Sequence, residues 1–210
     1  GKLFEYQGQL IRAKAIYSEC LELAQDLDMK QGRALSYLGL AKIHTLNENF
    51  MEALYDLRQG QALFQTLQLD LYMIECYLLL ANIYFGQGEY ENAEEQYGKA
   101  EETLIHVNIK WKLSAVYMGL ASIYQKLGKL DRANKTLNKA LRIAKKYDDS
   151  IMLGQIHTQY GLFCAEQNLH KEAIEHFVSA IVFLERTTCN LILAQSYYEY
   201  GRTLLQFERR

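Results

Sequence analysis

Residues 77–100 read YLLLANIYFGQGEYENAEEQYGKA, a sequence in which aromatic, small and turn residues stand at regular distances. From Tyr77 to Tyr84 the apolar and small residues follow the i, i+3, i+4, i+7 spacing of one helix face. Gly88 then supplies a residue that adopts a left-handed conformation at low cost, as the end of a helix often requires. A second helical pattern begins around Ala93. The segment therefore predicts two helices joined by a tight turn.

The same pattern recurs along the chain with a period of 40 residues. One alanine column repeats without a slip: Ala13, Ala53, Ala93, Ala133 and Ala173. A second column of small residues stands twelve positions before the last four of these alanines: Ala41, Ala81, Ala121 and Gly161. Four positions earlier still is a column of aromatic or histidine residues: Tyr37, Tyr77, Tyr117, His157 and Tyr197. Columns that keep one register over five repeats are typical of proteins built from stacked structural repeats.

Each repeat is predicted to contain a first helix, helix A, and a second helix, helix B. We expect the A helices at about 32–46, 72–86, 112–126, 152–166 and 192–206. We expect the B helices at about 9–26, 49–67, 89–106, 129–147 and 169–187. The turn after each helix A contains a Gly or an Asn that suits a left-handed conformation: Gly8, Asn47, Gly88, Gly128 and Asn168.

The composition excludes several classes of protein. Half of the 210 residues are apolar, which is enough for a large core and excludes intrinsic disorder, and the absence of Pro favours helices. A net charge of −2 gives no drive toward nucleic acid or acidic membranes. No apolar run approaches the roughly 20 residues of a membrane span, and no basic and apolar leader opens the sequence. We therefore expect neither a nucleic-acid partner nor a membrane partner.

Reactive side chains are scattered along the sequence. The four cysteines have no CxxC spacing and are predicted to be reduced thiols of a cytoplasmic protein. The five histidines are isolated in the sequence, and His170 and His176 are expected on different faces of one helix. Gly86-Gln87-Gly88 is a repeat turn rather than a nucleotide loop, and no carboxylate is marked for a raised pKa. The sequence predicts a chain that is not an enzyme, with no cofactor and no metal site.

One repeat resembles the motif of the tetratricopeptide repeat family almost completely, at Tyr77, Leu80, Ala81, Tyr84, Gly88, Tyr90, Ala93, Tyr97 and Ala100. The resemblance covers the whole chain, but the period is 40 residues instead of the family's 34, and the closing Pro is missing from every repeat. The six extra residues are about 1.7 helical turns, which we expect to lengthen helix B. Repeats of this length are similar to those of kinesin light chains, of Pins-like adaptors and of bacterial signalling regulators of the MalT and Rap kind.

The resemblance implies an all-α fold, a right-handed superhelix of antiparallel helix pairs. It implies a single solenoid over residues 1–210, with four full repeats at about 32–71, 72–111, 112–151 and 152–191 and partial repeats at 1–31 and 192–210. Neither end of the sequence supplies the polar cap that a solenoid needs, so we expect the chain to be part of a longer protein.

The resemblance also implies where a ligand binds, because A helices of this family line a concave groove that holds extended peptides. The positions that face such a groove here are Lys42, Leu78, Asn82, Met118, Ser122, Thr158, Tyr198 and Arg202. An Asn at the position of Asn82 commonly holds a ligand backbone in this family. The implied function is a non-catalytic interaction module that binds a peptide or protein segment, with some acidic character in the ligand. The alternative is a regulatory arm of a multidomain bacterial signalling protein or transcriptional regulator, which binds an effector or a neighbouring domain.

Charge divides the middle of the chain into two blocks. Residues 70–108 carry eight acids against one lysine, and residues 109–146 carry ten bases against one aspartate. The interpretation that we favour is pairing between neighbouring B helices, in which Glu95 meets Lys135 and Glu102 meets Arg142. Exposed pairs of this kind contribute about 0–1 kcal/mol each. The alternatives are a basic patch for an anion or nucleic acid and a surface for an acidic protein partner.

Overall fold

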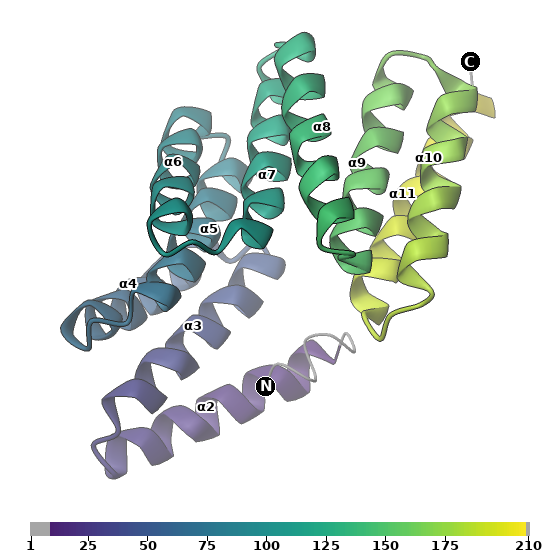
Figure 1. Cartoon of the computed structure of the whole chain (residues 1–210). Coiled ribbons are helices and arrows are strands. Elements are labelled where there is room, and N and C mark those ends of the chain that lie inside the picture. The colour runs from purple at the N-terminus through teal and green to yellow at the C-terminus, as the bar shows by residue number, and fades with distance from the viewer. Residues whose placement is uncertain (1–8, 209–210) are drawn as a thin grey trace. The chain divides into compact units, whose positions relative to one another are not determined.

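The computed structural model describes residues 9–208, and regular structure within this range is helical, with no strand (Figure 1). The helices are α2 (Leu10–Asp26), α3 (Lys30–Leu46), α4 (Phe50–Thr66), α5 (Asp70–Gly86), α6 (Tyr90–His106), α7 (Leu113–Lys126), α8 (Leu130–Lys146), α9 (Ser150–Glu166), α10 (His170–Leu184) and α11 (Asn190–Glu208), with a short 3-10 helix η1 (Lys110–Lys112) before α7. The predicted A and B helices are confirmed. Gly8 and the start of the first partial repeat lie outside the described residues.

The described residues form two compact parts, each built from helices that pack on their neighbours in sequence. The N-terminal half, residues 9–109, contains α2 to α6, and the C-terminal half, from residue 110, contains α7 to α11. In the N-terminal half α3 packs on α2, α4 and α5, and α6 packs on α5. In the C-terminal half α9 packs on α7, α8, α10 and α11. Each half therefore places A helices beside one another and B helices against them.

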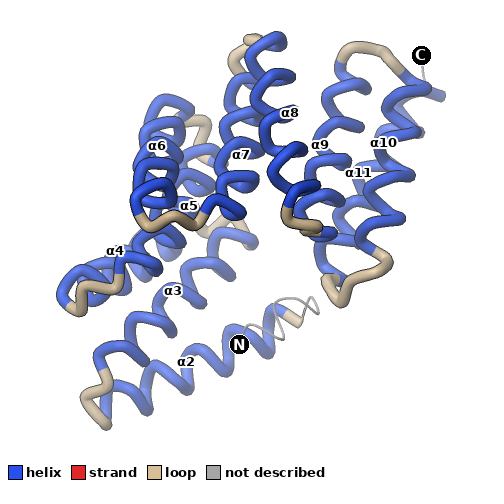
Figure 2. The backbone as a smooth tube through the Cα atoms, in the orientation of Figure 1, coloured by secondary structure: helices blue, strands red, loops and turns tan. Residues whose placement is uncertain are grey.

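The lengths of helices and turns account for the 40-residue period. In the repeat at 30–69, α3 and α4 have 17 residues each, and three residues separate each helix from the next (Figure 2). Helix A is thus as long as helix B in this repeat, and α5 and α6 are also equal at 17 residues. The extra residues were expected to lengthen helix B, and the two helices of the repeat share them equally.

The turns end their helices with a residue in the left-handed region. Gly88 and Gly128 have φ values of +79° and +71°, and Asn168 has +60°, as predicted. In the turn between α3 and α4 the left-handed residue is Glu48, with a φ of +59°, whereas the predicted residue, Asn47, has a φ of −90°. Glu48 takes this conformation because the N–H of Asn49 must reach back to the carbonyl of His44, which it does at 2.9 Å in the Schellman arrangement.

The B helices end in the same way, which the sequence did not indicate. Left-handed residues recur at the turns from helix B to helix A, again in steps of 40: Asp28, Gln68, Asn108 and Asp148. The N–H that follows each of them donates to a carbonyl five residues earlier, as Leu69 does to Phe64 at 3.0 Å. One backbone device therefore closes both helices of a repeat.

The small residues lie where two helices approach most closely. Ala93 is fully buried and Ala133 is 2% exposed, as the repeat pattern predicts. Gly161 shows how little room is available, because a Cβ at this position would lie 2.9 Å from the ring of Phe177. The side chains that fill the remaining space are large and apolar, including Leu57 and Phe64 in the N-terminal half.

Candidate functional site

In the N-terminal half the predicted ligand-binding residues lie on α3 and α5. Glu75, Leu78 and Asn82 are spaced i, i+3, i+7, so they share one face of α5. Asn82 is exposed and Leu78 is half-buried. Lys42 on α3 reaches the same face, because its Nζ lies 3.1 Å from Oε2 of Glu75. The three predicted residues of this half therefore gather beside one another, together with a glutamate that the sequence did not single out.

The carboxamide of Asn82 is held by a buried tyrosine from helix B of the same repeat. The hydroxyl of Tyr97 donates to Oδ1 of Asn82 at 2.7 Å. Burial raises the pKa of Tyr97, so this hydroxyl stays protonated and remains a donor. The Nδ2 group of Asn82 can still donate a hydrogen bond to a ligand. The oxygen of this carboxamide therefore already has a partner within the fold.

Lys42 is engaged in an ion pair that joins two A helices. Both its side chain and that of Glu75 are about 70% buried, with 29% and 28% exposed. A half-buried pair at 3.1 Å presents little net charge to a ligand. Lys42 therefore attracts an acidic ligand less strongly than an unpaired lysine at this position would.

In the C-terminal half, hydrogen bonds between A helices occupy two of the predicted residues. Oγ of Ser122 on α7 accepts from Nε2 of Gln159 on α9, and it donates to the carbonyl of Met118. Oγ1 of Thr158 on α9 lies 2.8 Å from Oγ of the buried Ser196 on α11. These two side chains tie neighbouring A helices together, and Met118 itself is half-buried.

The last helix carries two exposed residues of the predicted set. Tyr198 is 67% exposed, and Arg202 is also exposed. The guanidinium of Arg202 donates through Nε and Nη2 to Oε2 of Glu199 on the same helix, at 3.0 and 2.6 Å. Arg202 is therefore neutralised locally, whereas the ring of Tyr198 is open to a ligand.

Two histidines from different helices meet inside the C-terminal half. Nδ1 of His157 on α9 lies 3.1 Å from Nδ1 of His176 on α10, and the ring of Tyr160 stacks on His176. The ring of Phe183 lies against His157. Burial, the neighbouring His176 and Lys145 lower the pKa of His157 to about 4, and burial lowers the pKa of His176. These histidines are isolated in the sequence, but the packing of helix A on helix B brings together two residues that are 19 positions apart.

A histidine and an aspartate meet in the N-terminal half. Nδ1 of His44 lies 3.8 Å from Oδ2 of Asp56, beside an open pocket of about 380 Å³ that Met51 and Tyr55 also line. Burial raises the pKa of Asp56, against the lowering effect of His44 and Lys14. The prediction that no carboxylate has a raised pKa is therefore wrong for Asp56. The pair is too far apart for a hydrogen bond.

Other chemical features can be stated for residues 9–208. The four cysteines are free thiols, with Cys20 exposed and the other three buried. No group of three or more His, Cys, Asp or Glu side chains is placed to hold a metal ion in this range. None of the described helices combines the length and apolar character that crossing a membrane demands.

Models of the tetratricopeptide repeat family match two segments of the chain, residues 112–186 and residues 74–103. Together these segments make up half of the 210 residues. No curated protein sequence matches the chain.

Solved structures share its arrangement of helices. BtubC (BKLC) from P. vanneervenii is 19% identical with a TM-score of 0.65, over 93% of this chain and 85% of that protein. A Rap protein in complex with Competence and Sporulation Factor is 17% identical with a TM-score of 0.72, over 98% of this chain and 61% of that protein. Aspartyl phosphate phosphatase F from Bacillus subtilis is 13% identical with a TM-score of 0.68, over 96% and 56%. At these identities the likeness shows the fold, and the chain spans little more than half the length of the last two proteins.

Proposed function

Because the chain belongs to the tetratricopeptide repeat family, we propose that it is a non-catalytic protein–protein interaction module that holds a peptide or protein segment along the faces of its A helices. The observation that carries the proposal is the bond from Tyr97 to Asn82, which orients an exposed carboxamide before any ligand arrives. The free thiols are consistent with a reducing compartment, and we place the module in the cytoplasm.

The face of α5 supplies what an extended peptide needs. A peptide backbone in this conformation presents carbonyl groups that find no partner within the peptide itself. Nδ2 of Asn82 donates to one of these carbonyls, and Leu78 one turn away packs against an apolar side chain of the ligand. The pre-set orientation of Asn82 lowers the entropy that is lost when the peptide binds. In the C-terminal half the exposed ring of Tyr198 is the corresponding contact.

The test isolates the donor of Asn82 from its role in the fold. The substitution Asn82→Asp keeps an oxygen that accepts from Tyr97, and it replaces the Nδ2 donor by a second oxygen. A peptide selected from a display library on the chain is labelled and titrated against the parent and the variant. We expect the affinity to fall about three- to tenfold, as the loss of one hydrogen bond predicts.

The matched control is Gln59→Glu, which makes the same change from amide to acid at an exposed position of α4. It is expected to leave the affinity within about twofold. An equal loss in both variants, or none with Asn82→Asp, would place the peptide elsewhere.

A regulatory arm is the second candidate function, and the comparison with Rap proteins is the observation that favours it. One of those proteins was solved in complex with Competence and Sporulation Factor, and it is longer than this chain, which covers 61% of it. In this case the repeats bind an effector and change the activity of a domain elsewhere in the same protein. The sequence of the parent gene on both sides of residues 1–210 tests this candidate, since it requires an attached catalytic or DNA-binding domain.

A further inference from the structure

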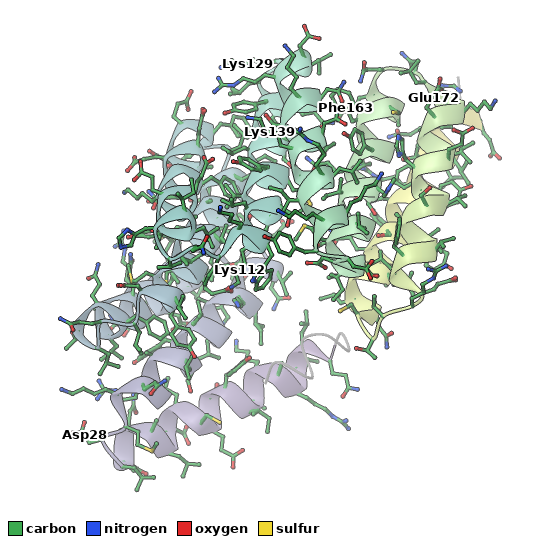
Figure 3. The ribbon with its side chains drawn as sticks, viewed as in Figure 1. Asp28, Lys112, Lys129, Lys139, Phe163 and Glu172 are labelled. Carbon is green, nitrogen blue, oxygen red and sulfur yellow. The ribbon has the colours of Figure 1, made fainter. Side chains whose placement is uncertain are left out.

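The helix α8 carries a stripe of cations on its exposed side. Lys135, Lys139, Arg142 and Lys146 are all exposed, and their spacing of i, i+4, i+7, i+11 places them within one narrow face. The first and last of these cations are eleven positions apart, which is about 16 Å along the helix. Lys139 is labelled in Figure 3 on this helix, with Lys129 just before its first residue.

These cations lack acidic partners in their own part of the molecule. Within the described residues of the C-terminal half, none of the four forms an ion pair with a carboxylate. The nearest acid in the sequence of α8 is Asp131, one turn before Lys135. The acid predicted to pair with Lys135 was Glu95, and its carboxylate lies 2.6 Å from Lys99 on its own helix. The ammonium of Lys139 lies 5.6 Å from the ring centre of Tyr117, a contact that positions the cation without neutralising it.

We infer that the stripe of Lys135, Lys139, Arg142 and Lys146 is a docking surface for an acidic segment of a partner protein. Carboxylates spaced one helical turn apart, or on alternate residues of an extended chain, fall beside successive cations of the stripe. The arginine accepts a carboxylate in two parallel hydrogen bonds, and the lysines act as point charges around it. The inference does not depend on the function proposed for the A helices, because α8 is a B helix.

The chemistry of α8 favours a protein over a membrane. Membrane-surface helices insert an apolar face among the lipids. The apolar side of α8 is buried in the protein, with Ala133, Leu137 and Ala140 at most 2% exposed. The helix therefore has a charged face and no apolar face to insert.

The same helix is a poor match for nucleic acid. Proteins that hold single strands combine cations with aromatic side chains on which the bases stack. The rings beside the stripe already have cations over them, because the ring centre of Tyr117 lies 5.6 Å from the ammonium of Lys139 and that of Tyr147 lies 5.7 Å from the ammonium of Lys146. Duplex binding usually neutralises more phosphates than four side chains can reach, and the chain as a whole has a net charge of −2. A short acidic peptide is the polyanion that four cations in a line suit best.

The experiment measures the binding of a fluorescein-labelled peptide of alternating Glu and Ala by anisotropy, at about 50 mM and about 300 mM salt. The test variant is Lys135→Gln/Lys139→Gln/Arg142→Gln. The matched control is Lys30→Gln/Arg58→Gln/Lys171→Gln, which removes the same charge from exposed positions on three other helices. We expect the test variant to bind about tenfold more weakly and the control to stay within about twofold. The affinity of the parent should fall at the higher salt.

Four outcomes would overturn the inference. The first is no binding of the peptide at the lower salt, and the second is an equal loss of affinity in the test variant and the control. The third and fourth are that a single-stranded oligonucleotide, or phosphatidylserine vesicles, bind more tightly than the peptide and that this binding depends on the same three residues. Thermal melting checks that the test variant is folded. If its melting temperature falls, Arg142→Gln alone is used, and its expected loss is about two- to fivefold.

Discussion

The hydroxyl of Tyr97, a buried residue of helix B, donates to Oδ1 of Asn82, an exposed residue of helix A in the same repeat. This bond of 2.7 Å joins the core of the repeat to the surface that we propose binds a ligand. Tyr97 also occupies an aromatic position of the repeat motif, so one side chain serves both packing and ligand positioning. A change at either residue therefore affects both stability and binding, to different extents.

Asn82→Ala should cost more stability than Tyr97→Phe. The first change leaves a buried hydroxyl without its acceptor, which costs about 1–3 kcal/mol of unfolding free energy. The second change removes the hydroxyl and leaves the exposed carboxamide to water, which costs about 0.5–1.5 kcal/mol. Urea denaturation of both variants measures the difference. The reverse order would mean that the bond does not form in solution. If Asn82→Ala left the unfolding free energy unchanged, as the exposure of Asn82 by itself would suggest, this too would mean that the bond does not form in solution.

Ala133→Leu should destabilise the C-terminal half. Ala133 is 2% exposed and sits in the alanine column of the repeat, so three additional carbon atoms have no space. Overpacking of this kind costs about 1–3 kcal/mol. The control is Ala62→Leu, the same change at an exposed position of α4. An unchanged melting temperature for Ala133→Leu would contradict the close approach of α7 and α8.

Acid should weaken the packing of α9 on α10 through the histidine pair. The folded protein holds the pKa of His157 at about 4, against 6.5 for an ordinary histidine, and it lowers the pKa of His176 as well. The unfolded chain then binds more protons than the folded chain between these pH values. The contribution of the neutral histidine pair to the unfolding free energy is therefore fully present above pH 6.5, and it is lost as the pH is lowered toward 4.

The groups that face this pair come from three helices: Lys145 on α8, Tyr160 on α9 and Glu175 on α10. His157→Phe places an aromatic residue in a column where other repeats have Tyr, and it should reduce the pH dependence of the melting temperature between pH 7 and pH 4. His106→Phe, at an exposed histidine of α6, is the control and should leave the slope as in the parent. Identical slopes for the parent and His157→Phe would show that the pair does not carry the effect.

Glu48→Gly should stabilise the N-terminal half. Glu48 has a φ of +59°, a conformation that costs a residue with a Cβ about 1–2 kcal/mol and costs Gly little. The equivalent positions of the next two repeats are Gly88 and Gly128, so the turn accepts Gly. The gain should be about 0.5–1 kcal/mol, since Gly also adds entropy to the unfolded chain. Glu52→Gly, in the first turn of α4, should instead cost about 1 kcal/mol. Urea denaturation distinguishes the two signs.

The arrangement of helices was predictable because it depends on local chemistry repeated many times. The spacing of small and aromatic residues within 77–100 sets one helix pair, and each further copy of the pattern supports the same boundaries. The observed helices accordingly begin and end within a few residues of the predicted ones. The left-handed residue at position 48 was missed because Asn is locally preferred over Glu, whereas the hydrogen bond from Asn49 to His44 determines the position.

The partners of individual side chains depend on which helices pack together, and the sequence does not state them. The contacts between Tyr97 and Asn82, and between His157 and His176, join residues 15 and 19 apart on separate helices. The ion pair of Lys42 and Glu75 joins two repeats. A repeat pattern places each residue on a face of its own helix, but a hydrogen bond forms only where two faces meet at about 3 Å. Tertiary packing therefore decided which of the predicted ligand-binding residues are available and which already hold the fold together.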